Sequence, residues 1–246
     1  MKILPSIFLY LCIVNSNVYA DELKSGFVYL SEIDPSIVIN LKYHNNENFT
    51  GKKVKGCNTG RAVLTDKAAD ALINIQEDLL TYGYSLVVYD AYRPKKSYDE
   101  FNNWLQNEDT KEIQNLYCPN LKKESIKSKG YIKTKNAHVR GSTVDVTIIP
   151  LQTKLCISGP KEKRSYRDQK DIIFENDGSL DMGTSYDTLD PLSEFDNQNI
   201  PEVAQKNREF LRKMMQNHGF VLSSKFWWQF TLIREPYMDS QFDFDV

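Results

Sequence analysis

One short stretch of the sequence combines residue types and a spacing that suit metal chemistry. His138 stands three residues before Gly141 and seven before Asp145, in the segment N-A-H-V-R-G-S-T-V-D. A glycine lets the backbone turn between the two side chains, so that they converge on one point. An imidazole nitrogen and a carboxylate oxygen are both zinc ligands. The spacing alone leaves two interpretations open, a metal site and a hydrogen-bonded His–Asp pair, and the pair is the commoner arrangement.

The other two histidines, His44 and His218, are expected to lie outside such a site. His44 is in a polar segment, Y-H-N-N, and His218 stands beside Gly219 at the predicted end of a helix. A cation at a helix C-terminus is favoured by the helix dipole. Surface or capping roles are therefore predicted for both.

Three predicted strands position the candidate residues. Residues 143–149 are rich in β-branched side chains and end at Pro150, so Asp145 lies on a strand. Residues 85–89 form a second, buried strand, which ends in Asp90-Ala91-Tyr92-Arg93-Pro94 because proline lacks a ladder donor. Residues 226–233 form the third.

Helices are predicted between these strands. Apolar residues recur at helical spacing after Thr65 as far as Gly83, residues 95–105 look helical, and a further helix runs from Pro201 to Gly219. The charge-rich residues 160–171 are expected to form a solvated loop. This order predicts an α+β fold: a single domain, residues 21–246, with a small, mostly antiparallel sheet flanked by helices.

Residues 1–20 have the pattern of a secretory signal peptide. A short basic start precedes an apolar run over residues 3–14, and Val18-Tyr19-Ala20 supplies a cleavage-like end. The alternative is a buried N-terminal strand or helix. The apolar run is too short to cross a bilayer, and no later stretch is suited to do so. We therefore expect an exported protein, periplasmic or secreted in a bacterium, with no membrane span in the mature chain.

Charge and cysteine content limit the kinds of partner and metal site that we expect. Lys and Arg number 31 and Asp and Glu 33, a net charge of -2, which gives no bulk electrostatic basis for a nucleic-acid partner. Cys57, Cys118 and Cys156 remain after signal removal, and none forms a C-x-x-C pair, so a thiolate zinc site is not expected. One disulfide with a free thiol and three unpaired thiols both stay open.

The H-x-x-G-x-x-x-D segment resembles the signature of the zinc D-alanyl-D-alanine dipeptidases, the vancomycin-resistance type of peptidase. Further blocks resemble that family in the same order across nearly all of residues 27–246. They are N-F-T-G at 48–51, D-A-Y-R-P at 90–94, S-K-G-Y at 128–131, D-M-G-T at 181–184 with Tyr186-Asp187, W-W at 227–228 leading to E-P-Y at 235–237, and F-D-F at 242–244.

The resemblance implies a D,D-peptidase type of fold and a zinc ion held by two histidines and an aspartate. It places His138 and Asp145 at two of the zinc ligands and Arg93 as the transition-state stabiliser. A zinc ion with three protein ligands keeps a position for water and polarises the scissile carbonyl. For Arg93, a structural salt bridge with Asp90 is the alternative.

The last block departs from the family pattern, E-W-W-H. This chain reads Phe226-Trp227-Trp228-Gln229, so Phe226 stands at the general-base position and Gln229 at the third-ligand position. An amide oxygen is a poorer zinc ligand than imidazole, so zinc affinity is expected to fall. Phe226 cannot accept a proton, and a general base contributes roughly 10²–10⁴-fold.

Two functional hypotheses follow from these residues. The first is a zinc dipeptidase that hydrolyses D-Ala-D-Ala in cell-wall peptide metabolism, with weakened activity. The second is an inactive homologue that binds D-Ala-D-Ala or peptidoglycan stem peptides. In either case Trp228 is expected to shape the recess, and Asp187 and Asp90 to form a rim for the substrate's amino group, although loop-capping roles for the two carboxylates fit the sequence equally well.

Overall fold

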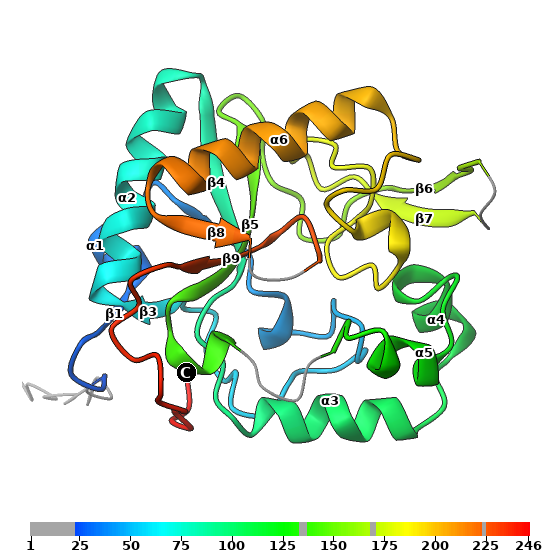
Figure 1. Ribbon diagram of the computed structural model, residues 1–246, viewed down its shortest axis with the longest axis horizontal. Coiled ribbons are helices and arrows are strands. Elements are labelled where there is room, and N and C mark those ends of the chain that lie inside the picture. Colours follow the sequence, from blue (N-terminus) through cyan, green and yellow to red (C-terminus); the bar gives the residue numbers. More distant parts are fainter. Residues whose placement is uncertain (1–22, 133–136, 168–170, 223–224) are drawn as a thin grey trace, which may run out of the picture.

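A five-stranded sheet forms the centre of the computed structural model (Figure 1), which describes residues 23–132, 137–167, 171–222 and 225–246. The predicted signal peptide lies outside these residues. The sheet has the order β2-β4-β5-β9-β8. Its strands are β2 (Val38–Ile39), β4 (Tyr84–Asp90), β5 (Thr143–Pro150), β9 (Gln229–Leu232) and β8 (Phe220–Leu222). Only the β2–β4 pair is parallel among these neighbours; the other pairs are antiparallel.

Helices and two small sheets surround this centre. The helices are α1 (Leu30–Ile33), α2 (Asp66–Thr81), α3 (Ser97–Gln106), α4 (Lys111–Tyr117), α5 (Lys123–Ser128) and α6 (Glu202–Asn217), with 3-10 turns at Lys42–His44, Ala137–Arg140 and Pro191–Ser193. β1 (Phe27–Tyr29) pairs with β3 (Val63–Thr65), and β6 (Lys161–Arg164) pairs with β7 (Ile172–Glu175). The mixed content and the mostly antiparallel sheet confirm the predicted α+β class.

Local sequence signals set the ends of the two long helices. Thr65 caps α2 because its hydroxyl accepts a hydrogen bond from the Ala68 amide at 3.3 Å. Gly83 follows that helix with φ +81°, a conformation that costs glycine little. α6 begins after Pro201 and is followed by Gly219 with φ +83°. Both helices place an apolar face on the core, as their spacing predicts.

The central strands β4 and β5 are buried along almost their whole length. Their consecutive apolar residues, such as Val87, Val88 and Val146, are fully enclosed. Asp90 and Asp145 stand opposite one another in the β4–β5 register, and Asp145 in turn stands opposite Gln229 of β9. The rigid core of the sheet therefore brings together polar residues that are far apart in the sequence.

Two segments differ from their predictions. Residues 160–171 were expected to form a loop, but residues 161–164 are β6, an exposed charged strand that pairs with β7. The charged sequence of β6 gives no strand signal, because this strand is stabilised by its pairing with β7, whose Ile172 and Phe174 are buried. The third predicted strand is also shorter than expected: Phe226 makes only an isolated bridge with Glu194, and the strand begins at Gln229.

The three cysteines of the described chain are all free thiols. Cys57 and Cys118 are buried and Cys156 is exposed. Burial raises the pKa of Cys57 to about 12, which makes its thiol a poor nucleophile. Among the described helices, none is both long and apolar enough to cross a membrane.

Candidate active site

His138 lies on the 3-10 turn just before β5, with its ring completely buried. Its Nδ1 is 2.7 Å from the carbonyl oxygen of Ala91 and 3.1 Å from Oδ2 of Asp90. Because a carbonyl oxygen only accepts, Nδ1 carries a proton, and in the neutral ring Nε2 presents its lone pair. A carboxylate or carbonyl behind the imidazole is the usual way in which a metal-binding histidine is oriented.

Asp145 faces the other side of that imidazole. Its Oδ1 is 3.2 Å from Nε2 of His138, and its Oδ2 accepts a hydrogen bond from the Tyr186 hydroxyl at 2.8 Å. Burial alone raises the pKa of Asp145, but His138, Arg93 and the Tyr186 hydroxyl outweigh it and hold the pKa below its ordinary value. Asp145 is therefore a carboxylate kept ionised in a buried site.

The geometry of this pair fits a bound cation. Oδ1 of Asp145 is buried and has no hydrogen-bond donor among the described residues. Ligand atoms about 2 Å from a tetrahedral zinc ion are roughly 3.3 Å apart, close to the 3.2 Å between His138 Nε2 and Asp145 Oδ1. One ligand atom each from Asp90, His138 and Asp145 lie within 4.8 Å of one another. The residues present therefore include a group that can hold a metal ion, and the predicted ligands His138 and Asp145 both belong to it.

Gln229, which is predicted at the third-ligand position, lies next to His138. Its Nε2 is 3.0 Å from His138 Nε2, so the amide donates to the imidazole lone pair. The structure thus brings together all three residues predicted at the metal positions. Gln229 offers an amide oxygen where the family pattern has an imidazole, which leaves one nitrogen and one carboxylate as the strong ligands.

Phe226 is part of a stack of three rings beside the same group. Its ring is 4.4 Å from that of Trp228 at an interplanar angle of 8°, and 5.2 Å from that of Tyr131 at 26°. All three rings line one cavity. The position predicted for the general base is thus an apolar wall, where no side-chain atom of Phe226 can accept a proton.

Arg93 follows β4 and is held from two directions. Its Nε is 2.5 Å from Oδ2 of Asp90, and its guanidinium lies 4.6 Å from the ring centroid of Tyr43. Nη1 of Arg93 is buried and has no acceptor among the described residues. Arg93 therefore forms the salt bridge to Asp90 through Nε and also keeps Nη1 available as a hydrogen-bond donor. Asp90, which the sequence suggested as part of a rim for an amino group, instead lies behind the imidazole and beside Arg93.

Asp187 is the one described non-glycine residue with a positive φ, 64°. Its Oδ1 accepts a hydrogen bond from the Tyr43 hydroxyl at 2.8 Å, while its buried Oδ2 has no donor among the described residues. Burial, reinforced by the charge of Asp145, raises the pKa of Asp187 to about 7. A half-satisfied carboxylate in this position suits a cationic group on a ligand.

Much of this site lines a single cavity of about 410 Å³, to which Arg93, Asp145, Asp187, Phe226, Trp228 and Gln229 contribute. The buried His138 and Asp90 are not among its lining residues. Tyr98 and Phe101 of α3 line it together with Asp145 of β5 and Gln229 of β9. The site therefore combines aromatic walls with a few polar atoms directed at one point, as small-molecule sites do.

Sequence reasoning placed the other two histidines outside this group and missed two tyrosines. His44 contacts the Cys57 carbonyl oxygen at 3.3 Å, and His218 pairs with Asp78 at 2.7 Å. Tyr43 and Tyr186 orient Asp187 and Asp145 through their hydroxyls. Tyr186 stood inside a recognised block, but Tyr43 carried no signal of a role in the site.

Comparison with known proteins identifies the family. Residues 23–158 and 169–246 match the family model of the D-Ala-D-Ala dipeptidases, peptidase family M15. The chain belongs to the D-Ala-D-Ala dipeptidase family. It is 33% identical over 224 residues to the D-alanyl-D-alanine dipeptidase of Enterococcus faecium, covering 91% of this chain and all of that relative. It is 31% identical over 225 residues to that of Streptomyces coelicolor and 29% identical over 205 residues to that of Escherichia coli, which covers 83% of each chain.

Membership confirms the resemblance read from the ordered blocks. The chain is a dipeptidase-like member of a metallopeptidase family, and its site retains a group that can hold a metal. The roles of the individual site residues remain predictions. They are supported by the cavity that Arg93, Asp145, Asp187 and Gln229 line together, and by the contacts of the buried His138 with Asp145 and Gln229.

Proposed function

We propose that the protein binds the D-Ala-D-Ala dipeptide in this cavity and hydrolyses it slowly as a zinc dipeptidase. Among the described residues, seven buried side-chain polar atoms have no hydrogen-bond partner, and the observation that carries the proposal is that three of them belong to residues lining this cavity. These three are Nη1 of Arg93, Oδ1 of Asp145 and Oδ2 of Asp187. Buried polar atoms are seldom left unpaired unless a ligand or ion uses them.

The charges of these atoms match those of a zwitterionic dipeptide. Oδ2 of Asp187 is placed to accept from the ammonium group of the substrate, and Nη1 of Arg93 to donate to an oxygen that gains negative charge during hydrolysis. The aromatic walls around them exclude water and strengthen both interactions. Trp228 and its neighbours enclose the small apolar side chains of the dipeptide.

A zinc ion held by His138 and Asp145 would polarise the scissile carbonyl and supply an activated water. The chain's own residues do the rest. Asp90 and the Ala91 carbonyl fix the imidazole, Tyr186 fixes the carboxylate, and Arg93 stabilises the oxyanion. Proton removal from the attacking water lacks the usual base because Phe226 replaces it, which lowers turnover by roughly 10²–10⁴-fold.

Binding without turnover is the second candidate function. Two observations favour it. Gln229 forms a hydrogen bond with His138, and Phe226 packs in a stack of rings, so neither residue supplies a catalytic base. The ligand would be the same dipeptide or the D-Ala-D-Ala end of a peptidoglycan stem peptide.

We also propose that the protein acts outside the cytoplasm. The signal-like residues 1–20 support export, and the three free thiols are compatible with export because none is required for a structural disulfide. Peptides of the cell wall are the ligands available there.

Release of D-alanine tests the proposal. Purified protein with added Zn²⁺ is incubated with D-Ala-D-Ala, with L-Ala-L-Ala as the control for stereochemistry. We expect slow release from the D,D-dipeptide alone, abolished by a chelator and by His138→Ala. No release together with dipeptide-dependent thermal stabilisation would establish the binder. If the protein neither releases D-alanine nor is stabilised by the dipeptide, both proposed functions are refuted.

A further inference from the structure

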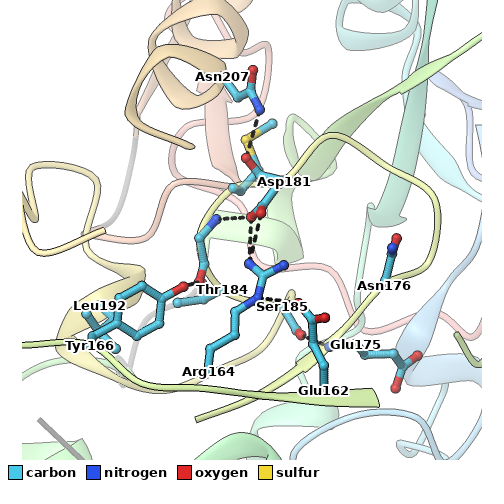
Figure 2. A network of polar contacts seen from close by, with 12 residues as sticks. Glu162, Arg164, Tyr166, Glu175, Asn176, Asp181, Thr184, Ser185, Leu192 and Asn207 are labelled. Carbon is cyan, nitrogen blue, oxygen red and sulfur yellow. Dashed lines mark hydrogen bonds and ion pairs between the residues drawn. The ribbon is translucent and has the colours of Figure 1, made fainter. Parts of the chain in front are cut away.

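The β6–β7 hairpin has a contact that the family comparison leaves unexplained. Residues 159–168, which include all of β6, lie outside the part of the chain matched to the family. Arg164 at the end of β6 nevertheless reaches the D-M-G-T block that precedes Tyr186 and Asp187. Figure 2 shows its guanidinium directed at the carboxylate of Asp181.

Arg164 is fixed by three partners. Its Nη1 is 2.9 Å from both carboxylate oxygens of Asp181, and its Nε is 2.6 Å from Oε1 of Glu162. The guanidinium also lies 3.3 Å from the ring centroid of Phe174 on β7. An arginine with both ion-pair and ring contacts has few other orientations available.

Asp181 in turn forms hydrogen bonds that fix the turn after it. Its Oδ1 accepts a hydrogen bond from the Gly183 amide at 2.7 Å, and its backbone carbonyl accepts one from Asn207 of α6 at 2.8 Å. Tyr166, two residues after Arg164, donates to the Gly183 carbonyl at 2.6 Å. The hydroxyl of Ser185 accepts from the Glu175 amide of β7 at 2.7 Å. The hairpin and α6 thus hold residues 181–185 from opposite sides (Figure 2).

The restrained turn leads directly into two residues of the site. Tyr186 donates to Oδ2 of Asp145, and Asp187 adopts its left-handed conformation at φ 64°. Asp adopts this conformation more readily than most residues other than glycine, but it still costs energy that the surrounding contacts must offset. The hairpin contacts at residues 181–185 lie immediately upstream of this strained residue.

We propose that Arg164 is a positioning residue that holds the 181–187 turn so that Oδ2 of Asp187 faces the ammonium group of the ligand. The identity of the ligand rests on the proposed function. The chain thus uses a hairpin whose first strand lies outside the matched region to help set the geometry of a binding carboxylate that also accepts a hydrogen bond from Tyr43.

Three variants test the role of Arg164 in binding. Arg164→Ala removes the contact, Arg164→Lys keeps the charge, and Lys163→Ala is the matched control because Lys163 pairs with Asp171 on the same hairpin and not with the turn. We expect Arg164→Ala to weaken D-Ala-D-Ala binding about 2- to 30-fold, the range of long-range positioning effects. Arg164→Lys should restore part of the affinity, and Lys163→Ala should leave it unchanged.

A ligand without the ammonium group separates positioning from loss of stability. N-acetyl-D-Ala-D-Ala lacks that charge, so its affinity should be the same for wild type and Arg164→Ala. Equal weakening of both ligands, or a lower Tm with unchanged affinity for D-Ala-D-Ala, would overturn the proposal.

Hydrogen exchange gives a readout that needs no ligand. Peptides covering residues 181–189 should exchange faster in Arg164→Ala and in Asp181→Asn than in wild type, and the double variant should add little to either. Unchanged exchange in this segment would overturn the role of Arg164. If wild type fails to bind the dipeptide while exchange responds as expected, the proposed function fails and the positioning role stands.

Discussion

Phe226 and Gln229 determine how far the site can support catalysis. Phe226, at the position predicted for the general base, is part of a ring stack, and Gln229 donates to the imidazole that would bind zinc. Both changes affect the same step, because a metal-activated water and its proton acceptor work as one unit.

Phe226→Glu combined with Gln229→His should therefore restore turnover. We expect the double variant to release D-alanine about 10²–10⁴-fold faster than wild type, the range of a general base, and each single variant to gain far less. Zinc affinity, measured by calorimetry, should rise with Gln229→His alone. A folded double variant as slow as wild type would show that these residues do not occupy the metal and base positions.

Asp187 should make stability depend on pH. Its native pKa of about 7 exceeds the ordinary value near 4, so between these values the native state holds a proton that the unfolded chain has released. The free energy of unfolding therefore falls as pH rises from about 4 to about 7. Asp187→Asn removes this contribution while keeping a residue that tolerates positive φ.

Urea unfolding at pH 5 and pH 8 checks this expectation. At pH 8 the Asn variant should be more stable than wild type by about 2–4 kcal/mol, and at pH 5 the difference should be much smaller. A difference of the same size at both pH values would mean that Asp187 is not the titrating group.

At the scale of elements, α6 joins the sheet to the loops that form the site. Arg208 of this helix is buried and donates to the carbonyls of Met182, Glu194 and Leu192 at 2.7–2.8 Å. Burial lowers the pKa of Arg208 to about 9. The three carbonyls belong to the chain on either side of Asp187, so α6 and the β6–β7 hairpin restrain the same region.

Arg208→Met should destabilise the protein by about 3–5 kcal/mol, because it leaves three carbonyls without donors. Arg212→Met on the same helix is the control: Arg212 pairs with Glu209 near the surface, and its loss should cost about 0.5 kcal/mol or less. Chemical unfolding of both variants measures the contrast. Equal losses would contradict the anchoring role of Arg208.

Elements with strong local signals were predictable, and elements stabilised by a distant partner were not. α2 has a threonine cap and regular apolar spacing, and β5 has a β-branched run, so both appear at their expected places. β6 has only charged residues and depends on its pairing with β7.

The same distinction holds within the site. His138 and Asp145 are close in sequence and Gln229 was placed by the ordered blocks. The contacts of Tyr43 with Asp187 and of Asp90 with His138 depend on how strands and turns pack, which spacing along one chain does not encode.

The molecule as a whole surrounds a buried site with an excess of negative charge. Asp90, Asp145 and Asp187 share one region with Arg93 and His138 as the basic groups. An enclosed site of this kind favours cations, and both a divalent metal and the ammonium end of a dipeptide meet that requirement. The core that encloses it extends across the central sheet and its helices as a single unit.

Calorimetric titration of the wild-type protein with D-Ala-D-Ala, with and without Zn²⁺, tests the central claim most directly. We predict saturable binding at one site per chain, tighter with zinc, absent for L-Ala-L-Ala and strongly weakened by Asp187→Asn. Absence of binding under both conditions, in protein shown to be folded, would contradict a dipeptide site in this cavity.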